Sequence, residues 1–85
     1  MNIKLTLPDY DGNAIDVIWD DDSLIDINYK EGTVIIRGNH NGLMSLAKQM
    51  IYLAINNVAQ GSHIHYDDFL LHNAPIELIV EKMID

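Results

Sequence analysis

The chain has 85 residues and carries 13 acidic against 5 basic side chains, a net charge of −8. Its length is sufficient for one small domain, and its hydrophobic share of 48% excludes an intrinsically disordered chain. Because acidic charge repels phosphate backbones and attracts basic surfaces, we expect no direct binding of nucleic acid and a preference for basic partners. The sequence contains no cysteine, which excludes disulfides and thiolate zinc sites.

The amino terminus shows no basic segment leading into an apolar run, so a secretory signal is not expected. The longest apolar-rich stretch, residues 43–59, is interrupted by serine, lysine, glutamine and asparagine and is not expected to cross a membrane. Together with the absence of cysteine, these features predict a cytoplasmic protein.

Alternation of apolar and polar residues predicts four strands in the first half of the chain. Residues 3–7 and 15–19 alternate on either side of a turn at 9–13, which indicates a first hairpin. Residues 24–29 and 33–37 alternate on either side of Lys30-Glu31-Gly32, which indicates a second and clearer hairpin.

The period then changes to that of a helix. Apolar residues from Leu43 to Val58 recur at helical spacing and cover an arc of roughly 200°. This wide arc predicts a deeply seated helix, and the remaining side is shared by polar residues and one tyrosine: Ser45, Lys48, Gln49, Tyr52 and Asn56. Asn39 or Asn41 is expected to cap its amino terminus, and Gly61 lies just past its expected end.

Two further alternating segments, residues 63–67 and 76–81, predict the last strands, with a loop at 68–75 between them. The element order is then ββββαββ. The predicted fold is α+β, with a single, mainly antiparallel sheet of about six strands and one long helix packed on one face, forming one domain over residues 1–85.

The segment "GSHIHYDD", residues 61–68, is the strongest candidate for a site. If Ile64 and Tyr66 face the helix, then His63, His65 and Asp67 point together to the open face of the sheet. That face is also expected to receive Asp16, Asp20, Asp26, Arg37, Glu77 and Glu81, with Ile18, Ile35 and Ile79 among them. Zinc accepts such a ligand set, and a small metal-binding or hydrolytic domain is therefore the alternative function. An open face offers no evident pocket and no fourth ligand, so we expect neither a metal nor another cofactor.

Catalytic arrangements are not evident. Ser62 and His63 are neighbours on a strand and point to opposite faces, which does not suit a nucleophile and its base. The same geometry separates Asp67 from Asp68, so a carboxylate dyad is not expected. We predict that the protein has no catalytic residues and is not an enzyme.

The run Asp20-Asp21-Asp22 is expected to form a solvated turn or to dock lysines and arginines of a partner. Trp19 continues the apolar register of the preceding residues and is expected in the core.

The stretches "RGNHNGLMSLAKQMIYLA", "GSHIHYDD" and "IELIVEKM" together resemble the immunity protein 32 family of bacterial polymorphic toxin systems. The family pattern has a Gly-Leu-x-x-Leu-Ala helix start, a Gly-x-His-x-His-Leu-Asp segment and a closing strand with Glu-Leu. The matching residues here are Gly42, Leu43, Leu46, Ala47, Gly61, His63, His65, Asp67, Glu77 and Leu78. Tyr66 stands where leucine is usual, and the first 37 residues fit only in being strand-rich and acidic.

The resemblance implies a non-enzymatic antitoxin that binds and neutralises a cognate toxin domain, often a nuclease. The acidic surface then predicts a basic toxin, with a partner-binding set drawn from the open sheet face and the aspartate run: Asp20, Asp21, Asp22, His63, His65, Asp67 and Asp68. A homodimer also remains open, since the helix arc is wider than one sheet face needs and a part near Met44, Ile51 and Ile55 is free to pack on a copy.

Overall fold

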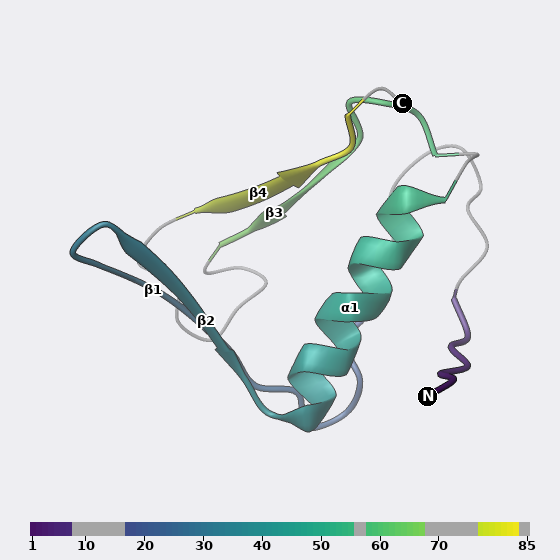
Figure 1. Ribbon diagram of the computed structural model, residues 1–85, viewed down its shortest axis with the longest axis horizontal. Helices are drawn as coiled ribbons and strands as arrows, with labels where there is room; N and C mark the ends of the chain where they lie inside the picture. The colour runs from purple at the N-terminus through teal and green to yellow at the C-terminus, as the bar shows by residue number, and fades with distance from the viewer. Residues whose placement is uncertain (8–16, 56–57, 68–76, 84–85) are drawn as a thin grey trace.

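The computed structural model describes residues 1–7, 17–55, 58–67 and 77–83 (Figure 1). Within this part, five elements follow one another: β1 Ile25–Lys30, β2 Thr33–Gly38, α1 His40–Ala54, β3 His63–Tyr66 and β4 Leu78–Glu81. The strands form two separate two-stranded antiparallel sheets, β1–β2 and β3–β4. Figure 1 shows both strand pairs on the same side of α1.

The prediction of a single six-stranded sheet in the order ββββαββ is therefore wrong. Residues 3–7 and 17–19 are not in strands, and residues 15–16 lie outside the described part of the chain. Alternation produces a strand only where a neighbouring strand completes its backbone hydrogen bonds. Here α1 side chains take that role: the Asp20 amide donates to Ser45 Oγ at 2.8 Å, and Gln49 Nε2 donates to the Ile18 carbonyl at 3.0 Å.

The second predicted hairpin is confirmed as β1–β2. Its register pairs Ile25 with Gly38 and Lys30 with Thr33. The two turn residues, Glu31 and Gly32, have φ of 51° and 80°, as a two-residue turn with left-handed central residues requires. Alternate side chains of β1 enter the core, where Ile25 and Ile27 are buried.

The predicted facing of the histidine strand is also confirmed. Along β3, Ile64 and Tyr66 are buried while His63 and His65 are exposed. The closing strand β4 begins at Leu78, two residues later than the alternation suggested, and residues 68–76 lie outside the described part of the chain.

The helix is confirmed, with Asn39 as its N-cap: Asn39 Oδ1 accepts from the Gly42 amide at 2.8 Å. It begins at His40, before the predicted start of the apolar arc at Leu43, and it ends at Ala54 rather than near Val58. Its carboxyl end is closed by a lysine, because Lys82 Nζ donates to the carbonyls of Ile55 at 2.6 Å and Val58 at 2.8 Å. Gly61 does not cap the helix; it adopts φ of 83° in the turn before β3.

The predicted buried side of the helix is wrong. The buried helix residues are Gly42, Ser45, Gln49, Tyr52 and Leu53, three of which carry a polar group. The opposite side is exposed; His40 stands at its start, and from there on it is apolar, with Leu43, Ala47, Ile51 and Ala54. Ser45 and Gln49 are buried because they satisfy the backbone of residues 18–20, which the apolar arc alone does not reveal.

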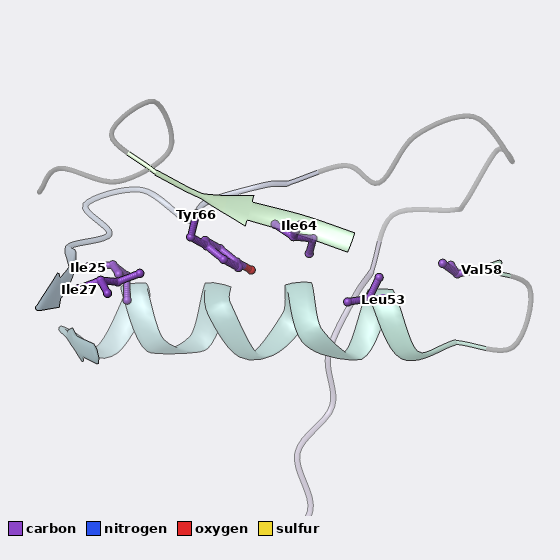
Figure 2. Packing of buried hydrophobic residues seen from close by; sticks show 6 residues of the cluster. All are labelled: Ile25, Ile27, Leu53, Val58, Ile64 and Tyr66. Atoms are coloured by element: carbon purple, nitrogen blue, oxygen red, sulfur yellow. The ribbon is translucent and has the colours of Figure 1, made fainter. Parts of the chain in front are cut away.

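The core lies between α1 and the two strand pairs. Its buried members come from β1, α1, the segment after α1, and β3. Figure 2 shows them on one side of the helix: Ile25, Ile27, Leu53, Val58, Ile64 and Tyr66. Trp19 packs against this cluster, as predicted, and lies edge-to-face with Tyr66 at a ring-centroid distance of 6.4 Å.

Candidate protein-binding surfaces

The outer face of the β3–β4 pair carries the histidines. Antiparallel register places His63 opposite Glu81 and His65 opposite Ile79. We call the exposed set formed by these four residues and Glu77 the histidine face. Its centre is apolar, because the Ile79 side chain is 48% exposed, and its periphery carries two carboxylates.

Local contacts hold the two imidazoles in place. Their rings lie edge-to-face with centroids 4.8 Å apart. Nδ1 of His65 is 3.1 Å from Oε2 of Glu77, and Nδ1 of His63 is 2.9 Å from the Gly61 carbonyl oxygen. Both rings are therefore held in defined orientations by contacts within the chain.

The inner side of β3 anchors this face to the helix. Tyr66 is fully buried, and its hydroxyl donates to Gln49 Oε1 at 2.7 Å. Burial raises the pKa of Tyr66 to about 12, because the phenolate would lose its hydration. The histidine face thus rests on a neutral, hydrogen-bonded tyrosine at physiological pH.

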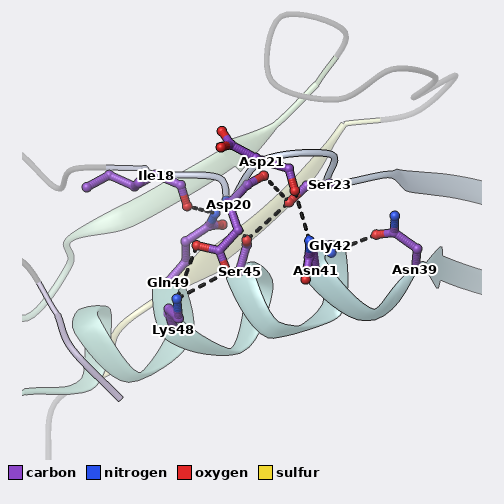
Figure 3. A network of polar contacts seen from close by, with 10 residues as sticks. All are labelled: Ile18, Asp20, Asp21, Ser23, Asn39, Asn41, Gly42, Ser45, Lys48 and Gln49. Atoms are coloured by element: carbon purple, nitrogen blue, oxygen red, sulfur yellow. Dashed lines mark hydrogen bonds and ion pairs between the residues drawn. The ribbon is translucent and has the colours of Figure 1, made fainter.

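A second polar surface is formed by residues 20–22, the acidic turn (Figure 3). Asp20 is engaged inside the chain, with both carboxylate oxygens 3.1 Å from Lys48 Nζ. The backbone carbonyls of Asp21 and Asp22 accept hydrogen bonds from Asn41 and Asn39, which fixes the turn over the first half of α1. The side chains of Asp21 and Asp22 are exposed.

The structure thus brings together some of the residues singled out from the sequence and separates others. His63 and His65 share one face, whereas the acidic turn lies over α1 and is not part of that sheet. Asp67 is half-buried just past the end of β3, and Asp68 lies outside the described residues.

Metal coordination finds no support in the described residues, where no group of three or more histidine, aspartate or glutamate side chains is arranged to hold an ion. His63 and His65 instead make the contacts given above. Likewise, no helix in the described ranges is long and apolar enough to cross a membrane.

Sequence reasoning missed the structural roles of Ser45, Gln49 and Lys82. The pair Ser45 and Gln49 stands four residues apart on one helix side, which is the spacing of a polar stripe. The sequence gives no sign that this stripe is buried, because its hydrogen-bond partners are more than 15 residues away in the chain.

The described residues thus form a small α+β arrangement with an exposed strand face and an acidic turn. Comparison with protein families identifies the class of protein. Residues 33–83 match the family described as Immunity protein 32, and the chain belongs to that family. Searches of curated proteins and of solved structures found no match.

Proposed function

We propose that this immunity-family protein neutralises a cognate toxin domain by binding it through the histidine face. The observation that carries the proposal is the exposure of Ile79 between two oriented histidines and two glutamates on a strand pair whose other side is in the core. An apolar centre within a polar periphery is the usual anatomy of a protein-binding patch. The family membership supports a toxin as the bound protein.

Electrostatics supports a basic toxin, with a nuclease as the leading class. The chain carries a net charge of −8. Of its five basic side chains, Lys48 is paired with Asp20 and Lys82 is bound to backbone carbonyls. The exposed Asp21 and Asp22 carboxylates therefore add to a largely uncompensated acidic field, which speeds association with a basic surface. Nuclease domains need such surfaces to hold phosphate backbones.

Neutralisation in this account requires binding alone. A toxin domain that is covered over its substrate-binding surface is inactive without any reaction by the inhibitor. We therefore infer a non-enzymatic role, with no cofactor, in the cytoplasm of the cell that makes the toxin.

Co-expression tests the proposal. The tagged protein is produced with the polypeptide encoded by the gene immediately upstream, and the two are expected to co-elute at moderate salt. Separate elution of two folded, soluble polypeptides would contradict the proposed function.

The contribution of the acidic turn is tested with a matched pair of variants. Asp22 and Glu31 both have left-handed backbones, with φ of 59° and 51°, and asparagine tolerates that conformation. Asp22→Asn and Glu31→Asn each remove one negative charge without imposing backbone strain. We expect Asp22→Asn to slow association and reduce its dependence on salt more than Glu31→Asn does. Equal effects of the two substitutions on association would show that the acidic turn is not part of the interface.

A further inference from the structure

The exposed side of α1 is apolar from Leu43 to Ala54, after the exposed His40 in the first turn. Leu43, Ala47, Ile51 and Ala54 form what we call the outer stripe of the helix. Leu43 is 47% exposed and Ile51 is 43% exposed, and the core lies on the other side of the helix (Figure 2). A helix side that combines large exposed aliphatic groups with no polar group is normally covered by another surface.

We infer that the outer stripe binds the outer stripe of a second copy of this chain, with the two helices antiparallel. A two-fold axis beside the middle of the stripe places Leu43 against Ala54 of the partner subunit and Ala47 against Ile51 of the partner subunit. Each large side chain then meets a small one, so the stripe is complementary to itself in shape. The helices can approach closely at both alanine positions.

Charge favours a second copy at this surface over a basic partner. With a net charge of −8, two copies repel each other wherever their carboxylates face. The outer stripe carries no charged side chain, so self-association there avoids the repulsion. The basic residue of α1, Lys48, is paired with Asp20 and adds no positive charge to the contact.

The size of the contact predicts its strength. From Leu43 to Ala54 the stripe is about 16 Å long at 1.5 Å per residue. A contact of this length buries less than the roughly 800 Å² per partner of a standard stable interface. The dimer should therefore be weak and depend on concentration. It leaves the histidine face free, so self-association and toxin binding are separable.

Sedimentation velocity across a concentration series, from low micromolar to several hundred micromolar, tests the inference. The wild-type protein should shift from monomer to dimer. Ile51→Ser should remain monomeric throughout while still co-eluting with the upstream-encoded polypeptide. Ile79→Ser, a matched change at an isoleucine of similar exposure (48% against 43% for Ile51), should dimerise as wild type does. A wild-type protein that stays monomeric, or an Ile51→Ser variant that dimerises normally, would overturn the inference. If the wild type stays monomeric and Ile51→Ser no longer co-elutes with the upstream-encoded polypeptide, the outer stripe belongs to the toxin contact instead.

Cross-linking tests the antiparallel register without weakening the contact, since the chain has no cysteine of its own. A mixture of Ala47→Cys and Ile51→Cys proteins should form a mixed disulfide under mild oxidation. Leu43→Cys alone should not, because its two copies lie at opposite ends of the stripe. If Leu43→Cys readily forms a disulfide with a second copy of itself and the mixture of Ala47→Cys and Ile51→Cys does not, the antiparallel arrangement is wrong.

Discussion

The hydroxyl of Tyr66 donates a buried hydrogen bond to Gln49 Oε1 at 2.7 Å, and this contact joins the inner side of β3 to α1. The same glutamine donates to the Ile18 carbonyl, so one side chain connects the strand, the helix and the segment before β1. Gln49 therefore holds together three parts of the chain that are distant in sequence.

Tyr66→Phe should lower the free energy of unfolding by about 1–3 kcal/mol, because Gln49 Oε1 would be left buried without a donor. Urea denaturation measures the change. Tyr29→Phe is the control, since Tyr29 is 59% exposed and should tolerate loss of its hydroxyl. Equal, small effects of the two substitutions would show that the hydrogen bond contributes little.

Stability should also fall at alkaline pH through Tyr66. Its folded-state pKa, about 12, lies above the ordinary value of 10.0, so the contribution of this group is complete below pH 10. As pH rises from about 10 to about 12, the unfolded state releases the proton first and the stabilisation, of order 2 kcal/mol, is lost. Tyrosinate absorbance should show a late-titrating component that Tyr66→Phe removes. Loss in Tyr66→Phe of a tyrosine that titrates near pH 10 would show that burial does not raise the pKa of Tyr66.

Gly42→Ala should destabilise the protein although alanine favours helices. A Cβ at Gly42 would collide with the Leu24 carbonyl oxygen and lie 2.9 Å from Asn39 Oδ1, the cap acceptor. We expect a loss of about 1–3 kcal/mol, the range typical of overpacked sites. The reverse change on the exposed side, Ala47→Gly, should cost about 1 kcal/mol from helix propensity alone. An increase in melting temperature for Gly42→Ala would show that the cap can shift at no cost.

Lys82→Met should destabilise the carboxyl end of α1. The ammonium group donates to the carbonyls of Ile55 and Val58, and charged hydrogen bonds of this kind contribute about 1.5–3 kcal/mol. Lys30→Met, which removes an exposed lysine from the end of β1, should change stability by less than about 0.5 kcal/mol. Hydrogen exchange should locate the Lys82→Met effect in the last turn of the helix. Uniform exchange along α1 in both variants would argue against a local cap.

Local pattern predicted the parts of the fold that depend on neighbouring residues. The β1–β2 hairpin follows from two alternating segments and the Glu31-Gly32 turn, and the outward facing of His63 and His65 follows from alternation within one strand. The sequence narrowed the capping residue to Asn39 or Asn41, and the structure selects Asn39.

The remaining features depend on contacts between distant segments. Ser45 and Gln49 look solvent-facing in the sequence, and they are buried because residues 18–20 cross the helix there. The same crossing removes residues 17–19 from the predicted sheet. Such long-range hydrogen bonds decide whether an apolar helix side faces the core or a partner. The spacing of apolar residues in the sequence contains no information about them.

Toxin binding through the histidine face is tested by calorimetric titration of the upstream-encoded polypeptide with three forms of this protein: wild type, Ile79→Ser and Val34→Ser. Ile79 and Val34 are strand residues of nearly equal exposure, 48% and 47%, and only Ile79 belongs to the histidine face. If the histidine face binds the toxin, wild type and Val34→Ser should bind tightly, and Ile79→Ser should bind at least about tenfold more weakly, as loss of an interface anchor produces. Absence of binding by wild type, or equal binding by all three forms, would contradict binding through this face.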